Sequence, residues 1–161
     1  MTLDAEQLRT AMRAWTSGVA IVTAAYDGQQ HGMTVSSFTS ISLDPPLVVI
    51  SLQTTSRTHD MVSRAGAFGV TILAAGQEEL SERFADRPPG RNHGLEGLQT
   101  ETLVTGAPMI RGGLASLDCK VSQAVRVGMN TLFIGEVVAV RGDDQAAPLI
   151  YHDRAYRRLG E

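Results

Sequence analysis

The sequence predicts a mainly β fold, an antiparallel barrel with short flanking helices. About seven runs rich in β-branched residues follow one another, and most are separated by glycine, proline or Asp-Gly turn signals. Helical periodicity is confined to three short segments. Strands in hairpin succession without long intervening helices favour an antiparallel barrel over a βαβ array. At 161 residues and 43% hydrophobic composition, the chain fits one domain with a substantial core.

The N-terminal third is predicted to be a helix followed by a hairpin. A helix is expected over residues 5–15, capped by Asp4, because apolar residues recur at helical spacing: Leu8, Ala11, Met12 and Trp15. Residues 19–26, VAIVTAAY, form the first strand, and Asp27-Gly28 is a strong hairpin signal. The chain then returns as a second strand.

That return strand, expected over residues 32–43, carries hydroxyls where a water-facing strand usually carries charge. Period-two alternation places Met33, Val35 and Ile41 on one face. The opposite face holds Phe38 among small hydroxyl side chains: Thr34, Ser36, Ser40 and Ser42. Proline ends the strand at Asp44-Pro45-Pro46, because it cannot donate to a sheet ladder. Residues 47–52, LVVISL, then read as a fully buried strand.

The rest of the chain continues the same mixture of strands and short helices. Ser56 is a plausible N-cap of the next helix and Gly66 its C-terminal stop. In chain order, the predicted elements are a helix over 57–65, a strand over 68–73, a helix over 77–85, a long loop over 86–100, strands over 114–127 and 131–141 joined by 128–130, and a short strand with a tail over 148–159.

Composition excludes several classes of function. The net charge of -3 and a pI near 5.8 give no electrostatic footprint for nucleic acid. No apolar run approaches the roughly 20 residues of a membrane span, and the N-terminus has no signal-peptide pattern. The single cysteine, Cys119, permits no intrachain disulfide, so we expect a cytoplasmic protein. A charged fraction of only 19% suggests that another subunit covers part of the surface.

The sequence lacks the motifs of dinucleotide-binding loops, phosphate-binding loops, hydrolase nucleophile elbows and metal sites. No G-x-G-x-x-G, G-x-x-x-x-G-K-[ST] or G-x-S-x-G occurs. The four histidines, His31, His59, His93 and His152, are far apart along the chain, and one cysteine cannot complete a zinc site, so we expect no metal.

One stretch does suggest an anion site. Ser56-Arg57-Thr58 stands at a predicted helix start, where free backbone N–H groups, two hydroxyls and a guanidinium can converge on a phosphate. The alternative is that Ser56 only caps the helix and Arg57 is solvated, and the local sequence supports both equally. The hydroxyl-lined strand nearby would let a flat ligand approach the backbone, although such serines can equally bond water.

Long ordered motifs resemble a known family, the flavin reductase-like, FMN-binding split-barrel proteins. The resemblance runs from about Leu8 to Leu159 through MRAWTSGVAIVTA, HGMTVSSFTSISLDPPLVVISLQTTSRTHDMV, ELSERFA, LASLDCKV, TLFIGEVVAV and PLIYHDRAYRRL. It is closest to the short-chain NAD(P)H:flavin oxidoreductases, the reductase components of two-component monooxygenases. The resemblance implies a homodimer of antiparallel split β-barrels, each a single domain over residues 1–161.

The resemblance also implies the ligands and their sites. The cofactor would be FMN or FAD, with NADH or NADPH as co-substrate. Flavin-binding residues carried over by motif are Met33, Thr34, Val35, Ser36, Ser37, Ser51, Leu52, Gln53, Ser56, Arg57, Thr58 and Ala85. Of these, Ser56, Arg57 and Thr58 would hold the phosphate and Ala85 would flank the flavin. Nicotinamide contacts would come from Asn130, His152 and Tyr156.

The activity implied is hydride transfer from the nicotinamide to flavin N5, with no protein nucleophile, followed by delivery of reduced flavin to a separate monooxygenase. Two positions depart from the family pattern. Asn130 stands where a histidine is common, and Pro88 stands where a phenylalanine often follows Asp-Arg. Asn130 cannot carry a positive charge, which keeps open the alternative of a tightly FMN-bound electron-transfer or flavin-sensing protein.

Overall fold

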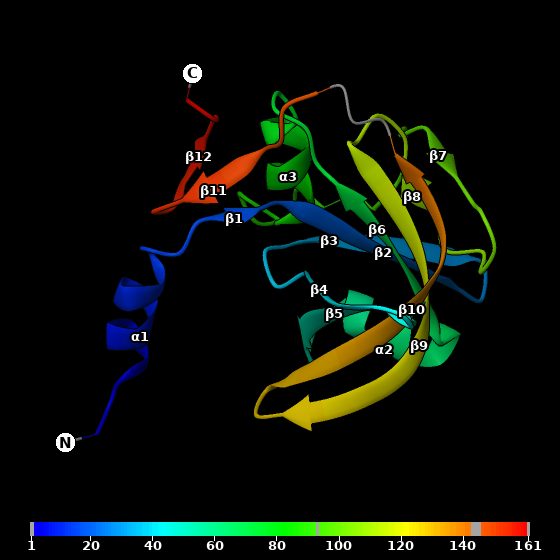
Figure 1. Ribbon diagram of the computed structural model, residues 1–161, viewed down its shortest axis with the longest axis horizontal. Helices are drawn as coiled ribbons and strands as arrows, with labels where there is room; N and C mark the ends of the chain where they lie inside the picture. Colours follow the sequence, from blue (N-terminus) through cyan, green and yellow to red (C-terminus); the bar gives the residue numbers. More distant parts are fainter. Residues whose placement is uncertain (1, 93, 143–145, 161) are drawn as a thin grey trace.

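A seven-stranded sheet forms the centre of the computed structural model, which describes residues 2–92, 94–142 and 146–160 (Figure 1). The strand order is β3-β2-β6-β9-β10-β5-β4, and every neighbouring pair is antiparallel. The strands are β2 (Ala20–Tyr26), β3 (Gln29–Val35), β4 (Thr39–Leu43), β5 (Pro46–Gln53), β6 (Ala67–Ile72), β9 (Ala115–Val127) and β10 (Asn130–Gly142). The predicted mainly β, antiparallel fold is confirmed.

Short helices and small ribbons surround this sheet. The helices are α1 (Ala5–Met12), α2 (Arg57–Ala65) and α3 (Glu78–Phe84). Two minor sheets contain β1 (Ser17–Gly18) with β11 (Ile150–His152) and β12 (Ala155–Arg157), and β7 (Thr100–Glu101) with β8 (Met109–Ile110). Across the described residues, no helix combines the length and apolarity needed to cross a lipid bilayer.

The central sheet wraps around one apolar core, and the barrel is split between β3 and β4. Buried side chains from opposite ends of the sheet, such as Val35 on β3 and Val48 on β5, belong to the same cluster as Phe68 and Phe133. Both ends of the sheet therefore face one interior. The edge strands β3 and β4 are not paired with each other, and residues 36–38 connect them. This opening positions the candidate site.

A second apolar cluster covers the outer face of β2 and anchors the elements that border the opening. Alternating residues of β2 pack into different clusters. Val22 belongs to the barrel core, whereas Ile21 packs outside the barrel with Phe84 of α3 and Leu149. Tyr151 and Tyr156 of the β11–β12 hairpin pack against the same outer cluster. Packing of these side chains holds α3 and the C-terminal hairpin beside the end of β3.

The predicted single strand over residues 32–43 is wrong, because the chain breaks after Val35 and resumes as β4 at Thr39. The break changes which side chains face inward. Phe38, expected on the hydroxyl face, packs against the barrel core. Ile41, expected beside Val35, is exposed, because it lies in an irregularity of the β4–β5 pairing between Ser40 and Ser42. A break in register cancels period-two alternation beyond it.

Two further expectations need correction. The first helix ends at Met12 rather than residue 15, because the next turn closes with tight bonds from Ala14 N to Ala11 O (3.2 Å) and from Trp15 N to Met12 O (3.1 Å). Its predicted cap, Asp4, is present. The strand predicted over residues 47–52 is not fully buried, because only alternate residues of the observed strand β5 are buried. The C-terminal segment 148–159 contains two strands, β11 and β12, where one was predicted.

Gly135 on β10 is required for close packing of the barrel core. A Cβ added there would lie 2.6 Å from Phe68 Cζ and 3.0 Å from Cys119 Cβ, and both neighbours are buried. We expect Gly135→Ala to lower the free energy of unfolding by about 1–3 kcal/mol through overpacking. Gly142→Ala on the same strand is the control, because its Cβ would meet only ordinary contacts at 3.7 and 3.8 Å. Equal urea midpoints for the two variants would contradict this reading.

Candidate active site

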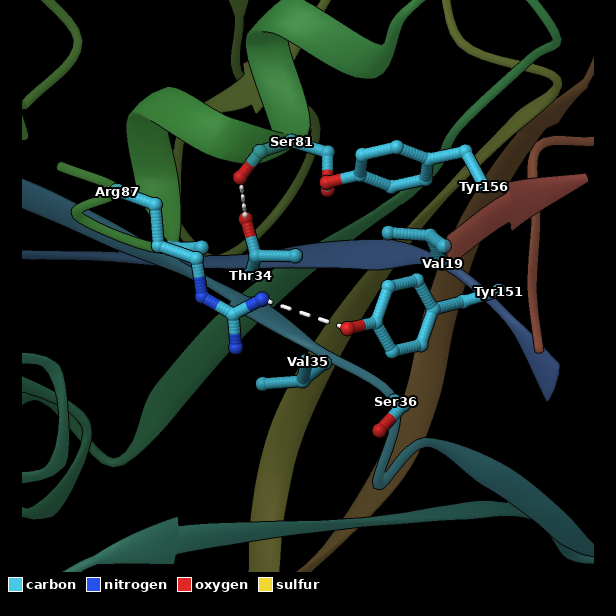
Figure 2. Close-up of a pocket in the computed structure, with 9 residues that line it drawn as sticks. Val19, Thr34, Val35, Ser36, Ser81, Arg87, Tyr151 and Tyr156 are labelled. Atoms are coloured by element: carbon cyan, nitrogen blue, oxygen red, sulfur yellow. Dashed lines mark hydrogen bonds between the residues drawn. The ribbon is translucent and has the colours of Figure 1, made fainter. Parts of the chain in front are cut away.

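A cleft made of two adjoining parts opens where β3 ends, between α2, α3 and the β11–β12 hairpin. Its wider part, of about 370 Å³, is lined by His31, Met33, Thr34, Ser56, Arg57, Thr58, Phe84, Ala85, Asp86, Arg87 and Asn92. Its narrower part, of about 110 Å³, is lined by Val19, Thr34, Val35, Ser36, Ser81, Ala85, Arg87, Tyr151 and Tyr156 (Figure 2). Thr34, Ala85 and Arg87 line both parts. We call the part around Arg57 the α2 end and the part around Tyr151 the tyrosine end.

The α2 end contains the predicted anion-binding residues. The Ser56 hydroxyl caps α2 by accepting from His59 N at 3.1 Å. The exposed Arg57 guanidinium donates to Gln29 Oε1 at 2.9 Å. Thr58 is fully buried at the inner wall of this end, and its hydroxyl bonds His31 Nδ1 at 2.8 Å. The helix cap and the cationic group expected here are therefore both present, and the hydroxyl of Thr58 is engaged by His31.

His31 is a residue of this end that the sequence analysis did not single out for binding. Burial lowers the pKa of its imidazole, the positive charge of Arg57 lowers it further, and the carboxylate of Asp86 opposes both effects. His31 lies two residues before Met33 on β3, so both side chains point from the same face of the strand into the cleft. That spacing was the only signal for His31 in the sequence.

The predicted hydroxyl wall is formed by the end of β3. The Thr34 hydroxyl donates to the Ser81 carbonyl of α3 at 2.7 Å, as Figure 2 shows. Val35 is buried in the barrel core, Met33 is half-buried, and Ser36 is exposed at the tyrosine end. The small hydroxyl side chains of Thr34 and Ser36 therefore line the cleft where β3 ends.

Other predicted residues form a separate cluster beside this wall. The Ser37 hydroxyl donates to Ser51 O at 2.9 Å and accepts from Ser51 N at 3.2 Å. The Asn130 amide donates to Ser51 Oγ at 3.0 Å, and Asn130 pairs with the exposed Gln53 across β5 and β10. Leu52 points into the barrel core. None of these five residues lines either part of the cleft, although Ser37 adjoins Ser36.

Two tyrosines and an arginine border the tyrosine end. The Tyr156 hydroxyl lies 2.8 Å from Ser81 Oγ and 2.7 Å from Glu82 Oε1. Burial raises the pKa of the Tyr156 phenol to about 12, the Ser81 hydrogen bond opposes this effect, and Glu82 adds to it. Arg87 extends across the opening towards Tyr151, with Nη1 at 3.4 Å from the phenol oxygen (Figure 2). The sequence analysis missed Ser81, Arg87 and Tyr151 here, since only the tertiary fold brings them to β3.

The remaining histidines and the cysteine lie outside the cleft lining or outside the described residues. His152 bonds Thr16 Oγ1 at 2.8 Å, and His59 bonds Thr131 Oγ1 at 2.8 Å. His93 is not among the described residues. Cys119 is buried, and desolvation, with a smaller contribution from Asp118, raises the pKa of its thiol to about 12. Within the described chain, no three His, Cys, Asp or Glu side chains gather as a metal-ligand set.

Comparisons with known proteins agree with this architecture. The profile of the Flavin reductase like domain matches residues 12–160. The chain is 34% identical over 154 residues to the reductase component of 4-hydroxyphenylacetate 3-monooxygenase from Thermus thermophilus, covering 96% of each protein. It is 37% identical to the FMN reductase (NADH) SmoA of Agrobacterium fabrum, covering 97% of this chain and 87% of that protein. The solved NADH:FAD oxidoreductase SgcE6 of Streptomyces globisporus superposes with a TM-score of 0.89 at 31% identity, over 100% of this chain and 98% of that one.

Proposed function

This chain belongs to the flavin reductase-like domain family, and from that premise we propose that it is an NAD(P)H:flavin oxidoreductase acting on free or exchangeable FMN or FAD. The observation that carries the proposal is the two-part cleft, which has the small side chains of Thr34 and Ser36 along one wall and the Arg57 guanidinium at its wider end. Relatives named for FMN and for FAD reduction both align over nearly the whole chain, so the proposal includes both flavins.

The residues present fit a flavin. An isoalloxazine ring is flat and offers donors and acceptors along one edge, which suits a wall formed by the small side chains of Thr34 and Ser36, and the small Ala85 in the same lining leaves room for the ring. A phosphate suits the α2 end, where Arg57 and the N-terminus of a nine-residue helix supply positive charge and N–H donors. We propose that Met33–Ser36, Ser56, Arg57 and Ala85 hold the flavin directly, and that Ser37, which adjoins Ser36 outside the lining, extends this wall.

Residues away from the lining take supporting roles in this proposal. Ser51 connects Ser37 to Asn130 through hydrogen bonds, while Leu52 and Gln53 belong to the strand that carries Ser51. Thr58 does line the α2 end, but its hydroxyl is engaged by His31, so it acts through that ring. These residues would position the hydroxyl wall and the α2 end rather than contact the ligand.

Tyr156 is the strongest of the proposed nicotinamide contacts, because it lines the tyrosine end beside Ser36. His152 and Asn130 remain proposed contacts, and each already has a side-chain partner, Thr16 for His152 and Ser51 for Asn130. A nicotinamide would have to share or replace those partners.

A bound flavin supplies the hydride-accepting chemistry, so no nucleophile or metal is required of the protein. The chain's own residues bind and orient the two ring systems, and reacting atoms must meet at about 3 to 3.5 Å for efficient transfer. Backbone N–H groups along β3 can stabilise negative charge that develops on the ring edge. Arg87 lines both parts of the cleft and extends towards the Tyr151 hydroxyl, where it can contact either ring system.

We propose that the reduced flavin leaves for a separate flavin-dependent monooxygenase. One relative is named as the reductase component of such a system, and its alignment covers 96% of this chain. We propose that the reaction takes place in the cytoplasm, because the single cysteine is buried and unpaired, as is usual in a reducing compartment. We treat residues 1–161 as one functional domain.

We further propose a homodimer, because helix α1 has no core to cover within its own chain. The helix stands off the body of the barrel, and none of its residues is buried (Figure 1). The side chains of Leu8 and Met12 are each 53% exposed, and that of the nearby Trp15 is 71% exposed. Apolar exposure of this kind on a short amphipathic helix fits burial against a second copy of the chain.

We expect light scattering at micromolar concentration to give twice the 17.2 kDa mass of one chain. Introducing charge with Leu8→Glu and Trp15→Glu together should shift the protein to monomer, because burying an unpaired carboxylate in an interface is unfavourable. Val104→Glu, at a residue that is 60% exposed on another part of the surface, should leave the dimer intact. A monomeric wild-type protein would contradict the proposed dimer.

The function is tested by turnover of excess free flavin. NADH and NADPH are each combined anaerobically with FMN, FAD and riboflavin, and flavin absorbance is followed with catalytic amounts of protein. The proposal expects many equivalents of flavin to be bleached by at least one nicotinamide. A full complement of flavin retained through gel filtration, without turnover, would instead indicate the electron-transfer or sensing role.

A further inference from the structure

The imidazole of His31 occupies an unusual position at the α2 end of the cleft. It projects from β3 next to Arg57, and Nδ1 is held by the fully buried hydroxyl of Thr58 at 2.8 Å. Since Nδ1 is engaged, Nε2 is the ring nitrogen left for a ligand. Although Thr58 lines this end, its hydroxyl is engaged by the ring, so its effect on a bound anion passes through His31.

The Thr58 hydroxyl tolerates either charge state of the ring. A hydroxyl both donates and accepts, so it can donate to a bare Nδ1 or accept from a protonated one. The ring can therefore take up a proton from solvent without losing its partner. This contact fixes the position of His31 while leaving its charge free to change.

The charges around His31 keep the ring neutral when no anion is present. From α2, Arg57 faces it; from the segment after α3, Asp86 and Arg87 line the same end, together with the uncharged Phe84 and Asn92. Burial is the largest cause of the lowered pKa of His31, followed by the charge of Arg57, and Asp86 acts in the opposite direction. A dianion placed between His31 and Arg57 would reverse this balance, because an opposite charge favours the protonated ring.

We propose that His31 recognises the flavin phosphate and takes up a proton from solvent as the phosphate binds, with Thr58 as its positioning residue. The inference rests on the proposed function, since it requires a flavin in the cleft. It assigns to His31 a role in discriminating phosphorylated flavin from riboflavin. Hydride transfer itself does not involve the residue.

The sign of the expected pH dependence follows from linkage. The pKa of His31 is low in the free protein and higher in the complex, so FMN binds more tightly as pH falls between those two values. The phosphate itself stays largely dianionic above its second pKa of about 6. From pH 8.5 to 6.5 the FMN dissociation constant should therefore fall by at most about tenfold per unit. Riboflavin, which has no phosphate, should show no such trend.

The test measures FMN and riboflavin dissociation constants by fluorescence between pH 6.5 and 8.5. We expect His31→Gln to remove the pH dependence of FMN binding and to weaken FMN at pH 6.5, while riboflavin binding stays within about twofold. Thr58→Val should reduce the pH dependence without abolishing it. His59→Gln is the matched control for the lost imidazole, because His59 is next to Thr58 on α2 but bonds Thr131 and does not line the cleft.

A second measurement needs no variant. Calorimetry of FMN binding in two buffers with different ionisation enthalpies should show proton uptake near pH 7, and riboflavin should show none. Equal pH dependence of FMN binding in wild type and His31→Gln, or no proton uptake, would overturn the role of His31 while leaving the reductase proposal standing. Failure of the wild-type protein to bind either flavin would overturn both.

Discussion

Replacing Arg57 with alanine is expected to weaken FMN binding roughly 10- to 100-fold, because a charge-assisted hydrogen bond to phosphate contributes about 1.5–3 kcal/mol. Riboflavin should bind within about twofold of wild type, since it lacks the anion that Arg57 would meet. Arg57 is exposed, lines the α2 end and has only the neutral Gln29 as a side-chain hydrogen-bond partner among the described contacts, so its charge is available to a ligand.

The matched control is Arg64→Ala on the same helix. Arg64 is also exposed, but it pairs with Asp60 at 3.0 Å one turn earlier and does not line the cleft. Both dissociation constants should be unchanged in this variant. If Arg57→Ala weakened FMN and riboflavin equally, Arg57 would contribute to the fold or to the ring site, and its phosphate role would be lost.

Filling the middle of the cleft should have the largest effect. Ala85 lines both the α2 end and the tyrosine end, so a phenyl ring there would occupy the space that a flavin needs. We expect Ala85→Phe to weaken FMN, FAD and riboflavin alike, by more than about 100-fold, because a displaced ligand loses its ring contacts and its phosphate contacts together. Equilibrium binding of the three flavins measures this.

Ala147→Phe controls for the added ring, because Ala147 is exposed and lines neither part of the cleft. It should bind all three flavins normally. Undiminished flavin binding by a folded Ala85→Phe protein would place the flavin elsewhere. The contrast with Arg57→Ala is informative, since one variant separates phosphorylated from unphosphorylated flavin and the other does not.

Local chemistry made much of the fold predictable. The Asp27-Gly28 turn, the Ser56 cap and the Gly66 stop are decided by neighbouring residues, and each is where the sequence analysis expected it. In the turn, Asp27 and Gly28 have positive φ values of 51° and 72°, as a tight hairpin requires. The long β10 strand likewise follows from its frequent β-branched residues, and the turn at Gly128 joins it to β9.

The remaining features depend on tertiary contacts. The break between β3 and β4 occurs in a run of hydroxyl residues with no proline or glycine, where the sequence gives no local signal. Strands of two or three residues, such as β1 and β8, are too short for a periodic pattern to reveal.

The candidate site shows the same division. Ser56, Arg57 and Thr34 were predictable from a helix start and a hydroxyl-rich strand, and all three line the cleft. Tyr151 and Arg87 come from distant segments that only packing against α3 and β2 brings together. The buried position of Thr58 and its contact with His31 were equally hidden, because burial of one helix residue depends on the strand that faces it.

The most direct test of the central claim is bleaching of excess FMN by NADH under anaerobic conditions, with wild-type and Ala85→Phe proteins compared at equal concentration. The reductase assignment and the location of its cleft together predict many turnovers for wild type and almost none for the variant. No bleaching by wild type with either NADH or NADPH would contradict the activity. Equal bleaching by both proteins would contradict the site.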